Sequence, residues 1–539
     1  MANRNILLIE PSYKNKYPPL GLMKIAQYHG PHGKKDNVRF IKGEDKKIEE
    51  TVWDRIYITT LFSFEWNKIS QSVDYASKLV NGQHDKIFVG GIAASLMHQK
   101  FLDESKWSGI RFINGLLSKS PSESLQLDDY SEELYADDTN GKPIEDLIPD
   151  YDILDHIEYK YPVNDAYFTY ASRGCIRKCS FCGVPKLEGG MREAEPLYNI
   201  VNGIEKLYGP KKDLILMDNN VVASSRFHEI IKEIRDLGFE AGAKLKRGNS
   251  NRLRRVDFNQ GVDARILCKS ANFLKELSTV CLSPLRIAFD HVGLMKPYET
   301  SIRYAHDAGL NCLSNYMLYN FHDSPEDLFT RMRINVSLNE ELKTQIYSFP
   351  MRFQPTDRPD RGHIGEHWNK YFLRSMQMIL QATHGVVSGA PNFFKRAFGD
   401  SYQDFENILS MPHRFIFNRD WYENYGGKAE LNEFKSVFNK LTESEKKELI
   451  VFLSNFNPSE RAGAVSDIKN KKIKNVFQFY IPIALDEEKK IWKKQKQYKK
   501  ENKINIEMTE EEIVEDAGLD EEIELTDKSK EDKKFAVIK

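Results

Sequence analysis

The sequence predicts an α/β protein with a Rossmann- or flavodoxin-like parallel sheet, then a (β/α)6 partial TIM barrel, then an α-helical C-terminal domain. Short apolar runs alternate with helical stretches over residues 1–118 and again over residues 165–358, which is typical of parallel sheets. Past residue 358 the apolar spacing becomes helical. A chain of 539 residues is also too long for one core, so several domains are expected.

The first series, residues 1–118, predicts five strands separated by helices such as LGLMKIAQYHG and SQSVDYASKLVNG. Ligands of such sheets bind at the carboxyl ends of the strands, and here one of those ends carries Gly90 and Gly91. The two glycines permit either the close approach of a cofactor or only a tight turn into the next helix, and both interpretations are open. The strands are NILLIEP, VRFIKG, RIYITTLFS, KIFVGGI and IRFINGLL.

The second series spans residues 165–358 and predicts six β/α units, two fewer than a closed barrel has. Reactive groups of such a barrel belong at the carboxyl ends of its strands. Residues 119–164 are expected to connect the two series, residues 359–482 to form the helical domain, and residues 483–539 to be a charged, disordered tail. The predicted strands are AYFTYAS (166–172), LILMDN (213–218), VDFNQGVDARI (256–266), PLRIAFD (284–290), NCLSNYMLYN (311–320) and IYSFPMRF (346–353).

The composition favours a cytoplasmic protein. The formal net charge is −1, and no apolar run approaches the roughly 18–20 residues that span a bilayer, so no membrane partner is expected. Six cysteines in so long a chain do not form a disulfide framework. The basic stretch AKLKRGNSNRLRR (243–255) has six cations but no aromatic residue for base stacking. It is expected to be a solvated loop, and a nucleic-acid partner is unlikely on these grounds.

Three of the six cysteines crowd into YASRGCIRKCSFCGVPK, where Cys175, Cys179 and Cys182 form the pattern CxxxCxxC. A structural zinc site needs four ligands, and a CxxC redox pair would leave Cys175 without a role. Soft thiolates favour a [4Fe-4S] cluster, in which three protein ligands leave one iron open to a substrate or cofactor. The three cysteines follow the first strand of the second series, where reactive groups are expected. The other cysteines, Cys268, Cys281 and Cys312, have no ligand spacing and are expected to be packed thiols.

This motif in this context resembles the radical S-adenosylmethionine (SAM) superfamily. The resemblance implies that the open iron binds SAM, that SAM is cleaved to a 5′-deoxyadenosyl radical, and that Phe181 packs beside the adenine. A reducing partner such as flavodoxin or ferredoxin is implied as well.

The arrangement of a first domain with LLIEPSYKNKYPPLGLMKIAQY and VGG before the barrel resembles the cobalamin-binding subfamily, whose members often transfer methyl groups. The chain departs from that subfamily in lacking DxHxxG, the sequence whose histidine binds cobalt, so cobalamin binding stays open. None of the 174 residues before Cys175 is a cysteine, which removes the auxiliary cluster of methylthiotransferases.

The resemblance also implies roles for polar residues at the strand ends. Asp218 and Asn220 would contact the SAM amino group, although a helix cap is the alternative. Arg265 would bind the SAM carboxylate, the alternative being an internal pair with Asp263. The remaining candidates are Gln260 and Asp290 for ribose or substrate, and Tyr316 and Asn320 for adenine, with Tyr316 alternatively in the core.

Three functions follow. The leading one is a radical SAM enzyme that acts on an unknown substrate and uses cobalamin for methyl transfer. The second is a cobalamin-independent radical SAM enzyme. The third, of another class, is a non-enzymatic iron–sulfur or zinc protein that recruits a macromolecule.

Overall fold

The computed structural model describes residues 4–117 and 143–501. Residues 119–142 of the expected connector, residue 118 before it and residues 502–539 of the expected tail therefore lie outside the description. The chain divides into two compact units. The first comprises Met1–Ala288, Leu294–Asn315 and Phe353–His363, and the second comprises Phe289–Gly293, Tyr316–Arg352 and Ile364–Lys539. The last strands of the second series therefore share a unit with the C-terminal helices, whereas the sequence predicts a boundary at residue 358.

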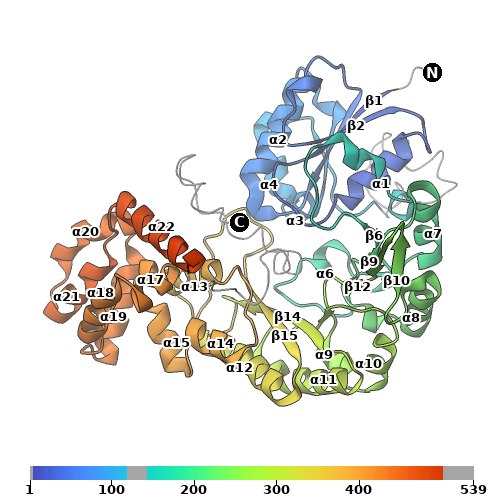
Figure 1. Ribbon diagram of the computed structural model, residues 1–539. Coiled ribbons are helices and arrows are strands. Elements are labelled where there is room, and N and C mark those ends of the chain that lie inside the picture. The colour runs from blue at the N-terminus through green and yellow to red at the C-terminus, as the bar shows by residue number, and fades with distance from the viewer. Residues whose placement is uncertain (1–3, 118–142, 502–539) are drawn as a thin grey trace. The chain divides into compact units, whose positions relative to one another are not determined.

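The first unit begins with a five-stranded parallel sheet in the order β2-β1-β3-β4-β5 (Figure 1). This is the flavodoxin-like order. The steps from β1 to β2 and from β3 to β4 run in opposite directions across the sheet, so right-handed crossovers place α1 and α2 on opposite faces. The elements are β1 (Asn5–Glu10), α1 (Leu20–His29), β2 (Asn37–Lys42), β3 (Arg55–Thr60), α2 (Trp66–Leu79), β4 (Ile87–Gly91), α3 (Ile92–Leu96), α4 (His98–Leu102) and β5 (Arg111–Phe112).

The strands of this sheet are buried on both faces, as parallel strands between helices should be. Four consecutive residues of β1, Ile6 to Ile9, have no exposed surface. Their apolar side chains fit the pleated surface and leave no polar face, which is why the sequence shows an unbroken apolar run instead of alternation.

The second series begins with three parallel strands in the order β12-β9-β6. A second sheet has the order β13-β14-β15, and isolated parallel bridges join Val256 to Leu282 and Val262 to Ile287. β14 passes from the first unit into the second, and β15 belongs to the second. The elements are β6 (Ala166–Thr169), α7 (Leu197–Tyr208), β9 (Asp213–Leu216), α8 (Phe227–Ile234), β12 (Val256–Phe258), α9 (Ala264–Leu267), α10 (Asn272–Leu277), β13 (Leu285–Arg286), α11 (Met295–Asp307), β14 (Cys312–Tyr319), α12 (Pro325–Leu342) and β15 (Gln345–Arg352).

β12 is much shorter than the strand predicted over residues 256–266. Gly261 has φ +81°, which turns the backbone out of the extended region. Asp263 then caps α9 by accepting a hydrogen bond from the N–H of Arg265. The polar residues of NQGVDAR therefore lie on a turn and a helix start, not on a strand.

Short hairpins and a helix not predicted from the sequence complete the first unit. β7 (Ser172–Arg173) pairs with β8 (Arg192–Glu193) around the cysteine segment, which also contains α6 (Val184–Leu187). The basic stretch expected to be a loop forms an antiparallel ribbon of β10 (Lys244–Arg247) and β11 (Ser250–Leu253).

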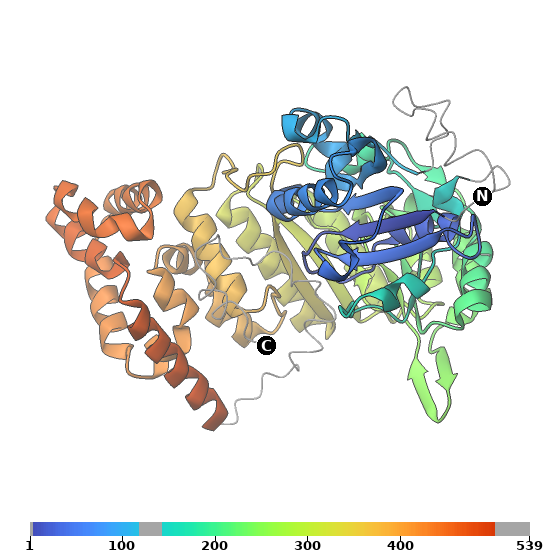
Figure 2. The ribbon, with the colours of Figure 1, turned by 90° about the horizontal axis from the view of Figure 1, so that it is seen from above.

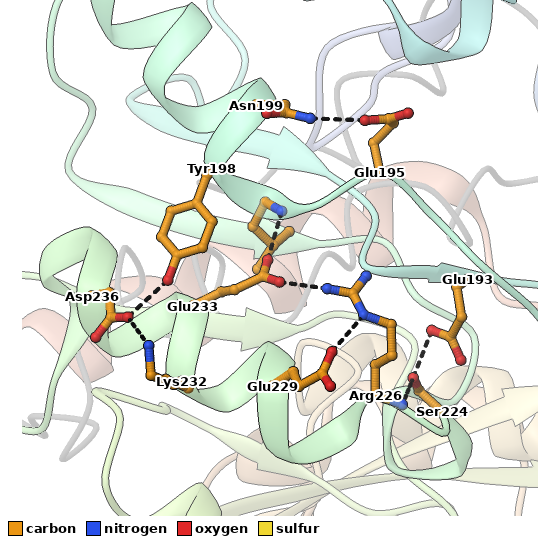
Figure 3. A network of polar contacts seen from close by, with 11 residues as sticks. Glu193, Glu195, Tyr198, Asn199, Ser224, Arg226, Glu229, Lys232, Glu233 and Asp236 are labelled. Atoms are coloured by element: carbon orange, nitrogen blue, oxygen red, sulfur yellow. Dashed lines mark hydrogen bonds and ion pairs between the residues drawn. The ribbon is translucent and has the colours of Figure 1, made fainter.

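A polar network braces α7 against α8 (Figure 3). The buried carboxylate of Glu233 accepts hydrogen bonds from the N–H of Leu197, at the start of α7, and from Arg226, at 2.7 and 2.6 Å. Beside it, the carboxylate of Glu193 accepts a 2.7 Å hydrogen bond from the Ser224 hydroxyl. These contacts fix the helices that follow β6 and β9.

The second unit is mainly helical, as the sequence predicts for residues 359–482. Its interior is aromatic and includes the fully buried Phe394, Phe398 and Phe405. Its helices after β15 are α13 (Lys370–Ala382), α14 (Pro391–Phe398), α15 (Tyr402–Leu409), α16 (His413–Phe417), α17 (Arg419–Asn424), α18 (Lys428–Phe438), α19 (Glu443–Asn455), α20 (Arg461–Ala464), α21 (Lys471–Phe477) and α22 (Leu485–Glu501).

α22 occupies the first part of the segment predicted to be a disordered tail. Its first turn carries Asp486, Glu487 and Glu488, and lysines follow, an order that favours a helix because it complements the helix dipole. Across the described residues, no helix is both long and apolar enough to cross a membrane.

Candidate active site

The three cysteines of the motif lie in one loop at the carboxyl end of β6, between β7 and α6. The loop is closed by backbone hydrogen bonds from Cys175 N–H to the carbonyl of Gly189, at 3.3 Å, and from Cys182 N–H to the carbonyl of Cys179, at 3.1 Å. Gly174 has φ +72°, and a Cβ there would lie 2.2 Å from the carbonyl oxygen of Gly190. Only glycine fits at the entrance to this loop.

Each of the three sulfur atoms has an N–H donor. The backbone N–H of Arg177 donates to Cys175 Sγ at 3.3 Å, and that of Val184 donates to Cys182 Sγ at 3.4 Å. The guanidinium of Arg265 donates to Cys179. The pKa of Arg265 is raised mainly by its hydrogen bond to Asp263, and the charge and hydrogen bond of Cys179 add to that rise. Such donors stabilise sulfur in the thiolate form, which is the form that binds metal.

The three cysteines are free thiols and half-buried. Within residues 4–117 and 143–501, no three His, Cys, Asp or Glu side chains are grouped so as to hold a single metal ion. A [4Fe-4S] cluster makes a different demand, since each thiolate binds a separate iron at its own corner of the cluster.

Asp263 joins the cysteine loop to the turn after β12. Its carboxylate accepts hydrogen bonds from Arg177 Nε at 2.7 Å and from Arg265 Nε at 2.8 Å. Burial alone would raise the pKa of Asp263, but the hydrogen bonds from Arg265 and Arg177 outweigh it and hold that pKa below its usual value. The internal Asp263–Arg265 pair, one of the two alternatives for Arg265, is therefore present.

Asp218, just after β9, supports the backbone that leads into the loop. Its buried carboxylate accepts the N–H of Ala171 at 2.9 Å and both the N–H and the hydroxyl of Ser172, at 2.5 and 2.6 Å. Burial raises the pKa of Asp218 to about 6. Nearby, the Asn220 side chain accepts the N–H of Asp263 at 3.3 Å and makes no cap bond to the short helix that follows it.

Glu188 also supports the backbone that leads into the cysteine loop, a role that the sequence did not predict. One of its oxygens accepts three donors: the N–H of Gly174 at 2.7 Å, Asn219 Nδ2 at 2.9 Å and Arg173 Nε at 3.0 Å. Arg173 also pairs with Glu145 at 2.5 Å and lies over the Tyr170 ring. A glutamate before two glycines belongs to no motif, so only the fold reveals its position.

The remaining first-unit candidates differ in exposure. Phe181 lies half-buried within the cysteine loop, and Gln260 is exposed on the turn after β12. A Cβ on Gly183 would lie 3.0 Å from Leu96 Cδ1, so the end of the loop packs closely on α3.

Gly90 and Gly91 have different surroundings at the carboxyl end of β4. Gly91 has φ +103°, and a Cβ there would lie 2.5 Å from the carbonyl oxygen of Thr60. A Cβ on Gly90 would meet nothing closer than 3.7 Å. Both line an apolar pocket with a volume of about 120 Å³. Its other walls are Gly21, Leu22, Ile25, Tyr57, Ile58, Thr59, Phe88, Ile113, Gly115, Leu117 and Ile144.

Three candidates lie in the second unit. Asn320 is fully buried with φ +67°, and its side chain accepts the N–H of Gly365 at 2.8 Å. The ring of Tyr316 packs 6.0 Å from that of Phe349. Asp290 is half-buried. Burial lowers the pKa of Arg331, and the nearby negative charge of Asp290 opposes that lowering.

The chain matches no family model. It is 27% identical over 186 residues to the ribosomal protein uS12 methylthiotransferase RimO of Christiangramia forsetii, a match that covers 33% of this chain and 35% of the relative. The chain thus spans about a third of the length of that curated relative.

Similar solved structures include the radical SAM methyltransferase TsrM of Kitasatospora setae with tryptophan and a SAM analogue bound (13% identity, TM-score 0.46, 75% of this chain and 89% of that one). A second structure of the same enzyme contains cobalamin and a [4Fe-4S] cluster (14% identity, TM-score 0.41, 66% of this chain and 77% of that one). A third similar structure is the apo cobalamin-dependent radical SAM enzyme OxsB (11% identity, TM-score 0.43, 96% of this chain and 82% of that one). The local similarity to a methylthiotransferase agrees with the resemblance predicted from the cysteine spacing.

Proposed function

We propose that this chain is a radical SAM enzyme that transfers a methyl group and uses cobalamin. The observation that carries the proposal is the cysteine loop, in which three thiols at the carboxyl end of β6 each have an N–H donor. The residues present fit a [4Fe-4S] cluster because thiolate ligands with such donors are typical of these sites. Bound there, the cluster would leave one iron open for SAM and supply the electron that cleaves it to a 5′-deoxyadenosyl radical.

The chain's own residues would shape this site. Cys175, Cys179 and Cys182 would hold the cluster, and the Asp263 carboxylate would fix the arginines beside it. Asp218 and Glu188 would hold the backbone that enters the loop. Asn220, Gln260 and Arg265 follow β9 and β12, at the same edge of the sheet as the cysteines, and we assign them to SAM.

The barrel is part of the proposal. The parallel bridges Val256–Leu282 and Val262–Ile287 continue the order from β6, β9 and β12 toward β13 and β14. We infer an open (β/α)6 barrel, and Asp290, Tyr316 and Asn320 stay assigned to SAM by the resemblance alone. The side-chain oxygen of Asn320 already accepts the N–H of Gly365. A contact between Asn320 and adenine would therefore use other atoms of the Asn320 side chain.

We assign the apolar pocket beside Gly90 to one edge of a corrinoid. Its walls are mainly aliphatic, and a Cβ at Gly90 would make only an ordinary contact with Ile113. No histidine lies between β1 and α1, so this connection would supply no histidine ligand to the cobalt. The lack of a cysteine before Cys175 favours methyl transfer over methylthio transfer.

The test is anaerobic purification, reconstitution with iron and sulfide, and reduction by flavodoxin in the presence of SAM. We expect about four irons per chain and the release of 5′-deoxyadenosine, measured by mass spectrometry. The Cys175/Cys179/Cys182→Ala variant should lose both, while the matched Cys268/Cys281/Cys312→Ala variant should keep the iron. A protein that takes up zinc and no iron would end the proposal.

Hydroxocobalamin tests the corrinoid separately. We expect hydroxocobalamin to remain with the wild-type chain through gel filtration. The Gly90→Val variant, which adds a side chain to the pocket, should not retain it. Release of 5′-deoxyadenosine without any retained corrinoid would replace this function by the cobalamin-independent one.

A further inference from the structure

The ribbon of β10 and β11 is the feature that the proposed function leaves unused. Among the strands of the described residues it pairs with no other, and Figure 2 shows it standing out from the neighbouring elements of its unit. Its strands pair from Lys244 with Leu253 to Arg247 with Ser250, joined by a turn in which Gly248 has φ +59°. An isolated two-stranded hairpin is marginally stable on its own, so its order needs an explanation.

Three of the six cations in residues 243–255 anchor the ribbon to neighbouring elements, and these anchors explain why it is ordered. Arg247 pairs with Asp165 at 2.9 Å and donates to the carbonyl of Pro210 at 2.7 Å. Arg254 donates to the carbonyls of Lys211, Lys212 and Gly238 and stacks 3.7 Å over the ring of Phe239. Arg255 pairs with Asp213 at 3.6 Å.

The other three cations point to a partner. Lys244, Lys246 and Arg252 are exposed, and within the described residues their side chains make no ion pair. The register places Lys244 and Lys246 on one face of the ribbon, about 7 Å apart, with Asn251 and the 63% exposed Leu253. No acidic residue occurs from Ala241 to Val256, so this surface suits a polyanion.

We propose that the ribbon binds the backbone of double-helical RNA. The two lysines on one face of the ribbon can contact successive phosphates, and Arg252, beside Leu245 on the opposite face, adds to the positive charge that attracts a polyanion. Single strands are usually held by stacking on aromatic rings, and the ribbon has none. Asn249 of the turn is followed at the start of β11 by Ser250 and Asn251. The side chains of all three both donate and accept hydrogen bonds, as ribose 2′-hydroxyls in the shallow groove of an RNA duplex do.

The test is fluorescence anisotropy of the full chain with a labelled 20-base-pair RNA duplex, at 50 to 200 mM salt. Lys244/Lys246/Arg252→Ser should weaken binding at least tenfold and reduce the slope of log K against log salt by about 2, as the loss of the two phosphate contacts made by the lysines requires. The control Lys269/Lys275/Lys296→Ser removes equal charge from exposed positions of the same unit and should change the affinity less than twofold.

Three outcomes would overturn the proposal. Equal weakening by the control would mean that only net charge matters. Equal affinity for a DNA duplex, for single-stranded RNA or for polyglutamate would reject RNA duplex as the partner. No binding of the RNA duplex at 50 mM salt would reject it outright. Because the test needs no cluster and no SAM, its result is independent of the proposed enzyme activity.

Discussion

The carboxylate of Glu188 accepts a 2.7 Å hydrogen bond from the backbone N–H of Gly174, the residue directly before the first cysteine of the loop. The next residue, Gly189, accepts the N–H of Cys175 itself. Glu188 and Gly189 therefore set the position of Cys175, and Arg173 and Asn219 hold the same carboxylate oxygen from the other side. We regard Glu188 as a positioning residue for the cysteine loop.

Glu188→Gln should loosen this loop. The amide loses the charge that faces Arg173, and hydrogen bonds to charged groups are worth about 1.5–3 kcal/mol each. We expect the reconstituted variant to lose iron about threefold faster during incubation with a chelator, followed by absorbance.

Glu193→Gln is the matched control, because Glu193 accepts the N–H and the hydroxyl of Ser225 and the hydroxyl of Ser224 but touches no part of the cysteine loop in those contacts. Equal iron loss from both variants would show that the Glu188 effect is general destabilisation.

Gly90 and Gly91 should respond differently to alanine. At Gly91 the positive φ and the clash with Thr60 predict a loss of more than about 1 kcal/mol of unfolding free energy. At Gly90 a methyl group fits, so the stability should change little while hydroxocobalamin affinity falls. Thermal unfolding and spectroscopic titration measure the two effects. A Gly91→Ala variant as stable as the wild type would contradict the conformational argument.

The sequence predicts well the elements that a local pattern of residues encodes. Buried apolar runs mark β1, β3, β4, β6 and β9, and the cysteine spacing marks the loop after β6. It predicts poorly the contacts between distant segments. Asp263 binds Arg177, 86 residues away, and nothing in either segment shows this choice. Likewise, the ribbon depends on Arg247 reaching Asp165, 82 residues earlier, which is why the stretch looks like a loop in the sequence.

The buried ion pair between Asp257 and Arg286 should be important for stability. Arg286 donates to both carboxylate oxygens at 2.9 Å and to the Ser314 hydroxyl at 3.2 Å, with both charged side chains almost fully buried. Asp257→Asn removes the carboxylate charge that two nitrogens of the buried guanidinium contact, so we expect a loss of about 3–5 kcal/mol, seen as a lower urea midpoint. Asp257→Asn combined with Arg286→Met should recover part of it. If the double variant is no more stable than the single one, the charge is not the cause.

The buried Lys24 of α1 should make stability depend on pH above neutrality. Burial lowers the pKa of Lys24 to about 8, and its ammonium donates to the carbonyl of Glu145. In the unfolded chain the pKa is about 10.4, so between these values the unfolded chain holds a proton that the folded chain has lost. The unfolding free energy contributed by Lys24 therefore rises with pH across that window.

Below pH 8 both states are protonated, and burying the charge costs about 3 kcal/mol, the free-energy equivalent of the pKa shift. Lys24→Met removes this cost and the hydrogen bond together, so we expect the variant to be about 1–3 kcal/mol more stable at pH 7. The advantage should shrink toward pH 10, measured by urea unfolding at both pH values. Lys78→Met, at an exposed position of α2, should show no such trend. An advantage that stays constant with pH would assign the effect to packing instead of to the proton.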